Sequence, residues 1–317
     1  FALNQINAQQ KNPGINLDVM DKSVKPGDDF FRYVNGSWFD KTEIPADRTR
    51  WGSFDELRQN TDKDALAILK DAASKKLDPK SDQAKAVNVY KTYMDTISRN
   101  KLGIKPIKPL LSKIDAVKSI ADLNKLIIEM QPQGGLGFYG IGVGPDAKNS
   151  NRNVVNIGLG SLGLPDRDYY VSEDADSKEK REKYVAHVAR MLQMVGEKPE
   201  VALENAKKVL AIEIAMATPR LDRVERRDRR KTYNPMSVAD LQKLTPPVNW
   251  DSYIKGVGIS KLDSVIVSQP KYMTTLETIF KENKIDEWKA YLRWSLINKS
   301  SDVLTTDLEK ANWDFYS

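Results

Sequence analysis

The chain of 317 residues contains no cysteine and only one histidine, His187. The absence of cysteine excludes disulfide bonds, catalytic thiols and metal sites built on thiolates. A zinc site built on histidine needs two or three imidazoles, commonly four residues apart in an H-E-x-x-H motif, so this chain cannot form one. His187 falls within a predicted amphipathic helix, where a packing or surface role is expected.

Long apolar runs are also absent, since no stretch approaches the roughly 18 apolar residues of a membrane-spanning helix. Neither the phosphate-binding pattern G-x-x-x-x-G-K-[ST] nor the nucleophile pattern G-x-S-x-G occurs. Carboxylates are plentiful, but nothing in the sequence pairs them for glycoside hydrolysis. The chain on its own therefore shows no recognisable catalytic residue.

The charge of the chain is mildly basic, with 50 Lys and Arg against 44 Asp and Glu, and the two signs are mixed. The densest basic run is LDRVERRDRRK at residues 221–231, and three acids interrupt it. Asp222 with Arg226 and Glu225 with Arg229 are four residues apart, which predicts an ion-paired helix face or an interdomain contact. A phosphate-binding patch is the alternative interpretation.

Helical periodicity dominates most of the chain. Ser81 is a predicted N-cap, and Gly196 is predicted to end a long helix. Helices are expected over about 55–73, after Ser81, and over 121–130, 178–195, 201–217 and 288–296.

One region breaks the helical pattern. Residues 134–163 contain two clusters of β-forming side chains around a turn-rich centre, which predicts a β-hairpin inserted in a helical protein. A second extended segment is expected at 264–267.

Residues 27–54 are the most aromatic part of the chain. Seven of these 28 residues are aromatic, about a quarter, against 8% for the whole sequence. Large rings gain free energy from burial, so we expect this segment to be pinned into a core while its polar residues reach a surface or cleft.

Several motifs follow one another along the chain. The pattern D-F-F-x-Y-x-x-G-x-W occupies residues 29–38, I-P follows at 44–45, and R-W-G-x-F-D occupies 50–55. G-L-P-x-R-D-Y-Y occupies 163–170, and VIVSQPKY occupies 265–272. In content and order these motifs resemble the neprilysin and endothelin-converting enzyme family of zinc metallopeptidases, which includes the bacterial PepO-type enzymes.

The resemblance implies a mainly α, two-lobed helical metallopeptidase with a central cavity that admits short peptides. The chain would be its N-terminal half and would form most of the cap lobe. Residues of about 1–55 would pack along the cavity between the lobes, and about 56–317 would form the helical cap lobe.

The resemblance also implies where the catalytic groups lie. One zinc ion would be bound by an H-E-x-x-H motif and a downstream glutamate in the C-terminal part of the family, so no catalytic or metal residue is expected in this chain. The chain would be truncated or one product of a cleaved precursor. Its expected partners are the C-terminal catalytic segment of that precursor and short peptide substrates.

One substrate-binding residue is implied by the resemblance. The family arginine of the R-[YW]-G-x-F motif binds the free carboxylate of the peptide, and Arg50 stands in its place. A guanidinium group pairs bidentately with a carboxylate, and an enclosed site strengthens the pair. The alternative is that Arg50 pairs with Asp47, Asp55 or Glu56.

The G-L-P-x-R-D-Y-Y motif is interpreted as a scaffold. We expect Arg167 and Asp168 to brace the loop that leaves the hairpin, with the two tyrosines packed below it. Animal members of the family have a cysteine where Asn35 stands, so the absence of cysteine indicates a bacterial-type member. The first residue is not Met, which indicates trimming and export to the envelope or outside, while a cytoplasmic location stays open.

Two other functions remain as alternatives. The first is a non-catalytic, helical peptide-binding or chaperone-like protein that keeps the fold without a catalytic half. The second is a basic nucleic-acid binder centred on residues 221–231, although nucleic-acid binders usually concentrate positive charge on one face. The favoured interpretation includes neither a nucleic-acid partner nor a membrane span.

Overall fold

A computed structural model describes residues 14, 16–46, 48–131, 134–282 and 284–317. These residues fall into two compact units, one ending at Thr92 and one running from Tyr93 to Ser317. Both units are mainly helical, which confirms the predicted fold class. The predicted division near residue 55 stays a prediction. Within the described ranges, no helix is both long and apolar enough to cross a membrane.

The first unit is a short series of helices. The side chain of Asp29 accepts a hydrogen bond from the Arg32 N–H and begins the first helix, and the Ser81 hydroxyl accepts from the Ala84 N–H as predicted for an N-cap. The elements are η1 (Leu17–Val19), α1 (Phe30–Lys41), α2 (Ser53–Ala73) and α3 (Asp82–Met94), whose last residues enter the second unit.

The prediction that the aromatic segment 27–54 is pinned into a core is wrong for the described unit. Phe30, Phe31 and Phe39 are all more than half exposed, and Phe54 is 86% exposed. Tyr33, Trp38 and Trp51 are half-buried. The helices of this unit are too few to cover seven rings. The high aromatic content predicted burial, but it could not show which surface the rings pack against.

The second unit contains the remaining helices. The helices predicted at 121–130, 178–195, 201–217 and 288–296 are all present. The elements are α4 (Thr96–Leu102), η2 (Lys105–Ile107), α5 (Lys108–Asp115), α6 (Ile120–Met130), α7 (Asp168–Val171), α8 (Ala175–Met194), α9 (Pro199–Ala217), η4 (Glu225–Arg227), α10 (Arg229–Thr232), α11 (Val238–Leu244), α12 (Trp250–Gly256), α13 (Pro270–Glu282), α14 (Ile285–Ser300), η5 (Ser301–Val303) and α15 (Thr306–Tyr316).

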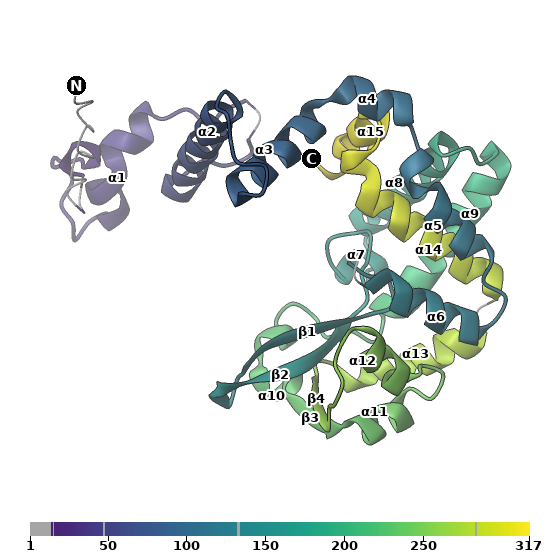
Figure 1. Cartoon of the computed structure of the whole chain (residues 1–317). Coiled ribbons are helices and arrows are strands. Elements are labelled where there is room, and N and C mark those ends of the chain that lie inside the picture. Colours follow the sequence, from purple (N-terminus) through teal and green to yellow (C-terminus); the bar gives the residue numbers. More distant parts are fainter. Residues whose placement is uncertain (1–13, 15, 47, 132–133, 283) are drawn as a thin grey trace. The chain divides into compact units, whose positions relative to one another are not determined.

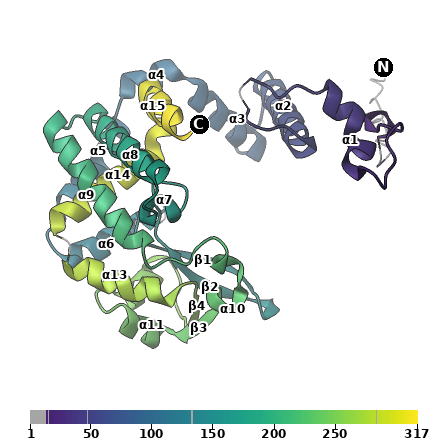
Figure 2. The ribbon, with the colours of Figure 1, turned by 180° about the vertical axis from the view of Figure 1, so that it is seen from behind.

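The core of the second unit lies where α8, α9 and α14 pack together. These helices lie side by side in both views of the ribbon (Figures 1 and 2). Tyr184, Met191, Val209 and Ile212 face this interior and are fully buried, as is Trp294. Gly196 follows α8 with a φ of 106°, so it ends the helix in the left-handed conformation that the sequence predicts.

The sheet is larger than the sequence suggested. The predicted hairpin is present as β1 (Tyr139–Asp146) and β2 (Asn149–Leu159), and the predicted extended segment is β4 (Ser264–Val267). A further strand, β3 (Asn234–Ser237), was not predicted because Asn-Pro-Met-Ser has no alternating β pattern. The four strands have the order β1-β2-β4-β3, with β2 parallel to β4 and the other pairs antiparallel.

The sheet lies toward the opposite end of the second unit from α8 and α9 (Figure 1). The buried Tyr272 of α13 ties this helix to the base of the hairpin, because its hydroxyl donates to the Phe138 carbonyl at 2.6 Å and accepts from the Gly160 N–H at 3.1 Å. The segment that leaves β2 is thereby fixed at its first residue, and residues 163–170 follow directly.

Candidate functional site

The predicted substrate-binding residue, Arg50, lies in the first unit between α1 and α2. Its side chain is exposed. No ion pair joins it to Asp55 or Glu56 in the described part of the chain, and Glu56 instead accepts a hydrogen bond from the indole N–H of Trp38 at 2.9 Å. Asp47, the third candidate partner of Arg50, lies outside the described residues. A carboxylate-binding role for Arg50 stays a prediction.

The G-L-P-x-R-D-Y-Y motif forms the turn between β2 and α7, and its end is buried. Tyr170 is 3% exposed and its hydroxyl accepts a hydrogen bond from the Leu164 N–H at 2.6 Å. This bond closes the loop on itself. Arg167 donates to its neighbour Asp168 at 3.0 Å, and the Asp168 side chain is largely exposed. The Tyr170 contact agrees with the scaffold interpretation of the motif.

A carboxylate that the sequence analysis missed lies beneath this loop. Glu213 of α9 is 1% exposed and accepts three hydrogen bonds. They come from the Tyr170 hydroxyl at 2.6 Å, the Tyr184 hydroxyl at 3.0 Å and the Gly163 N–H at 3.2 Å. Tyr184 in turn accepts from the indole N–H of Trp294 at 2.7 Å, so the network joins the loop to α8, α9 and α14.

Burial dominates the acid–base chemistry of this network. Loss of solvation raises the pKa of Glu213 to about 7, although its three donors act in the opposite direction. A signal for this residue was present in the sequence, because Glu213 follows Ala202, Ala206 and Val209 on one apolar helical face. A single acid on such a face indicates a buried, hydrogen-bonded carboxylate.

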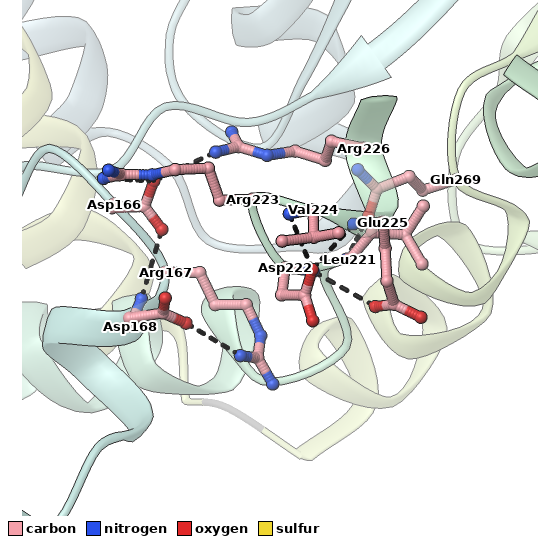
Figure 3. Close-up of polar contacts among 10 residues, drawn as sticks. All are labelled: Asp166, Arg167, Asp168, Leu221, Asp222, Arg223, Val224, Glu225, Arg226 and Gln269. Carbon is pink, nitrogen blue, oxygen red and sulfur yellow. Dashed lines mark hydrogen bonds and ion pairs between the residues drawn. The ribbon is translucent and has the colours of Figure 1, made fainter. Parts of the chain in front are cut away.

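A second missed carboxylate, Asp166, stands in the same motif. Its side chain is 6% exposed and binds two arginines of the basic run, Arg226 at 2.9 Å and Arg223 at 3.3 Å. Figure 3 shows both guanidinium groups reaching the Asp166 carboxylate from the segment after α9. Burial alone would raise the pKa of Asp166, but the Asp168 N–H and the two arginines lower it below its ordinary value.

The basic run 221–231 is ion-paired as expected, but not with the predicted partners. The run does not form one helix, because η4 and α10 are separate short elements. The predicted pairs four residues apart are not formed in the described structure. Asp222 instead accepts from the N–H groups of Val224 and Glu225, which turns the chain, as Figure 3 shows. The arginines are thereby directed at Asp166, which is distant in sequence.

The single histidine has a packing role. His187 of α8 is 5% exposed and its ring stacks on Phe315 with centroids 4.3 Å apart. Burial lowers the pKa of His187 to about 4, so the imidazole is neutral near pH 7.

Within the part of the chain that the structure describes, no three side chains among His, Cys, Asp and Glu lie together as a metal site would need. Glu213 accepts its three hydrogen bonds from two tyrosines and the backbone, and it lines a pocket of ≈ 240 Å³ together with Ser161, Ser295 and Lys299. The arrangement fixes the loop 163–170.

Comparison with protein-family models gives one match to residues 26–317, described as "Peptidase family M13". Among curated proteins, mouse endothelin-converting enzyme 1 is 26% identical over 312 residues, covering 94% of this chain and 40% of that protein. Neprilysin-3 of Drosophila melanogaster is 29% identical over 318 residues, covering 95% of this chain and 40% of that protein. The chain thus spans less than half the length of these relatives.

Two solved structures resemble the chain over most of its length. The zinc metalloprotease ZMP1 of Mycobacterium tuberculosis, solved in complex with an inhibitor, has a TM-score of 0.86 and 29% identity, covering 96% of this chain and 46% of that one. PepO from Lactobacillus rhamnosis has a TM-score of 0.80 and covers 92% of this chain and 46% of that one. Its identity of 19% shows likeness of fold alone.

Proposed function

Since the chain belongs to peptidase family M13, we propose that it is the N-terminal portion of a zinc-dependent endopeptidase that hydrolyses short peptides in an enclosed cavity. It supplies part of the cavity wall and recognises the C-terminal end of the substrate. One observation carries the proposal: the match covers residues 26–317 of this chain but less than half the length of its relatives. The catalytic residues therefore belong to the remaining part.

The zinc ion is assigned to that remaining part because the described residues do not fit it. No group of three potential ligands exists among them. The only imidazole of the sequence, His187, is buried against Phe315 inside the second unit.

The exposed rings of segment 27–54 support an interface with the C-terminal part of the same protein. Phe30, Phe31, Phe39 and Phe54 together present a large apolar area, and each ring can bury roughly 150–250 Å². We assign this surface to the C-terminal catalytic part of the same protein, which would cover the rings as a domain interface does. That the chain is a bacterial-type member and is exported stays a prediction from the sequence.

Joining this chain with its C-terminal part tests the proposed function. The chain alone is expected to bind no zinc and to leave peptides intact, because it lacks the ligands. The complex is expected to contain about one zinc and to hydrolyse short peptides, with all activity lost on chelation and restored by zinc. Metal analysis of both samples, with peptide cleavage followed by mass spectrometry, measures this. Stoichiometric zinc in the chain alone would contradict the assignment, and a zinc-free inactive complex would favour a non-catalytic peptide-binding protein.

Replacing Arg50 tests the recognition of the substrate's C-terminal end. In the complex, Arg50→Ala is expected to lower kcat/KM for a peptide with a free C-terminus by about 10- to 100-fold, which corresponds to one charge-assisted hydrogen-bonded pair. Cleavage of the same peptide with an amidated end should change little, because no carboxylate is present. The ratio of the two kcat/KM values is the quantity to compare.

The matched control is Arg58→Ala on α2, since Arg58 is also an exposed arginine of the first unit. It should leave the ratio between free and amidated peptides unchanged. Equal losses on the two peptides in Arg50→Ala would rule out a carboxylate-binding role for Arg50.

A further inference from the structure

A pocket of ≈ 320 Å³ lies between the G-L-P-x-R-D-Y-Y motif and the start of the basic run. Three arginines line it, and they come from different parts of the chain: Arg167 from the motif, Arg220 from the turn after α9 and Arg226 from η4. The rest of its wall includes Leu159, Leu162, Leu164, Pro165 and Asp166.

The charge of this pocket is positive even after its ion pairs are counted. Arg167 pairs with Asp168, while Arg226 shares Asp166 with Arg223. Four arginines, with Arg220 included, then face two carboxylates, which leaves a net charge of +2. Glu213 lines a different pocket and is bound there by its own three donors.

Arg220 contributes a charge that backbone carbonyls hold in place and that also acts on the carboxyl group of Glu213. Its Nε donates to the Met216 carbonyl at 3.0 Å and its Nη2 to the Gly160 carbonyl at 2.8 Å. No ion pair of Arg220 exists within the part of the chain that the structure describes. These two bonds fix the guanidinium group, which also lies over the ring of Tyr272 at 5.1 Å from the ring centroid.

Arg167 adds an unsatisfied donor to the same pocket. Its Nε is buried and has no hydrogen-bond acceptor in the described structure, while its Nη1 is held by Asp168 at 3.0 Å. Figure 3 shows the Arg167 guanidinium group directed toward Asp168, apart from that of Arg226 beside Asp166. A buried N–H without an acceptor costs free energy that an incoming oxygen atom would recover.

The three guanidinium groups are already held in place by their partners. Asp166 fixes Arg226, and backbone carbonyls fix Arg220, so little side-chain entropy is lost when an anion binds. The leucines and the proline of the wall lower the local dielectric constant and strengthen a charge–charge contact.

We propose that this pocket binds a carboxylate group of an acidic peptide, as a second recognition site separate from Arg50. A planar carboxylate matches the guanidinium fork, and its single charge is accommodated by a net charge of +2. The choice of a peptide as the ligand rests on the proposed peptidase function. The carboxylate comes from an acidic side chain or from a free C-terminus, which share this chemistry.

Binding of labelled tetrapeptides to the 317-residue chain, measured by fluorescence polarisation at low ionic strength, tests the site. One peptide has blocked ends and a single glutamate among alanines, the second has glutamine in its place, and the third is all-alanine with a free C-terminus. A carboxylate-bearing peptide is expected to bind about tenfold more tightly than the glutamine peptide. Preference for the first peptide assigns a side chain, and preference for the third assigns the C-terminus.

Arg220→Gln and Arg226→Gln should each remove most of that tenfold preference. Arg226 is 46% exposed, so its replacement keeps the proposal testable if Arg220→Gln fails to fold. The matched control is Arg230→Gln, because Arg230 belongs to the same basic run, is 92% exposed and lies outside the pocket. Equal binding of all three peptides, or an equal loss in Arg230→Gln, would overturn the proposal. The measurement needs neither zinc nor cleavage, so it is independent of the outcome for the peptidase function.

Discussion

The free energy of unfolding of Glu213→Gln, minus that of the wild type, is expected to increase by about 3 kcal/mol as the pH rises from 4.5 to 7. This difference should depend on pH because glutamine keeps the shape of the side chain and removes its titration.

The sign follows from proton binding in the two states. The pKa of Glu213 is raised from 4.5 to about 7 in the folded protein, so between these values the folded state holds a proton that the unfolded state has lost. Stability from this group is present at acid pH and is lost as the pH rises through that window. Tyr170 and Tyr184 donate to the carboxylate and Arg220 acts on it by charge, but burial outweighs all three.

His187 acts in the opposite direction over an overlapping range. Its pKa is lowered from 6.5 to about 4 by burial, so the unfolded state binds a proton that the folded state refuses. Stability from His187 is therefore present above pH 6.5 and is lost as the pH falls toward 4. In the wild type the two contributions largely cancel, which is why the difference between variant and wild type is the informative quantity.

Chemical unfolding of both proteins at several pH values measures this difference. His187→Phe is the matched control, because it keeps a ring against Phe315 and removes the opposite titration. Relative to wild type, this control should gain stability as the pH falls. If the three donors prevailed over burial, the Glu213→Gln difference would move the other way with pH, and the assignment of burial as the dominant cause would be wrong.

Much of the second unit could be predicted because its signals are local. Apolar periodicity located α6, α8, α9 and α14, and Gly196 marked a helix end through its own backbone preference. The hairpin was also predicted from a local signal, namely two clusters of β-forming residues around a turn-rich centre. β3 was not, since a strand of four residues is stabilised by its pairing with β4 rather than by its own sequence.

The polar contacts of the candidate site depend on residues distant in sequence, and the sequence predicted them poorly. Asp166 meets Arg226 across 60 positions, and Glu213 meets Tyr170 across 43. Pairs four residues apart were expected for the basic run, but two short elements replaced the helix that would have aligned them. Spacing predicts a contact only where the local structure is regular.

The aromatic segment 27–54 shows a different limit. Its composition predicted burial, but burial requires a partner surface, and Phe54 is 86% exposed in its own unit. The same reasoning applies to Arg50, whose side chain is exposed in its own unit, so its carboxylate-binding role stays a prediction. Sequence motifs identified the family of this region before its contacts could be known.

The largest loss of stability is expected at Gly160, the residue that directly follows β2. Gly160→Ala is expected to lower the free energy of unfolding of the second unit by more than about 3 kcal/mol. A Cβ atom at this position would overlap the Gly137 carbonyl oxygen and would lie 2.6 Å from that of Phe138 and 2.5 Å from Met216 Cε. Met216 can move, but the two carbonyl groups belong to the backbone.

Those carbonyl groups are held by buried tyrosines. Phe138 accepts the Tyr272 hydroxyl at 2.6 Å, and Gly137 accepts the Tyr291 hydroxyl at 3.0 Å. Relief of the overlap would require the base of the hairpin to move away, which would break these hydrogen bonds. The expected loss in free energy of unfolding for Gly160→Ala therefore combines the steric overlap with the loss of these hydrogen bonds.

Gly142→Ala in β1 is the matched control, because a Cβ atom there has no neighbour within 4 Å. Its free energy of unfolding should stay within about 1 kcal/mol of the wild type, since the added methyl group mainly restricts the unfolded chain. Urea unfolding of the three proteins, followed by circular dichroism, gives the comparison. If Gly160→Ala were as stable as Gly142→Ala, the hairpin base would be free to shift, and the hydroxyls of Tyr272 and Tyr291 would not be fixing the loop that carries Asp166 and Arg167.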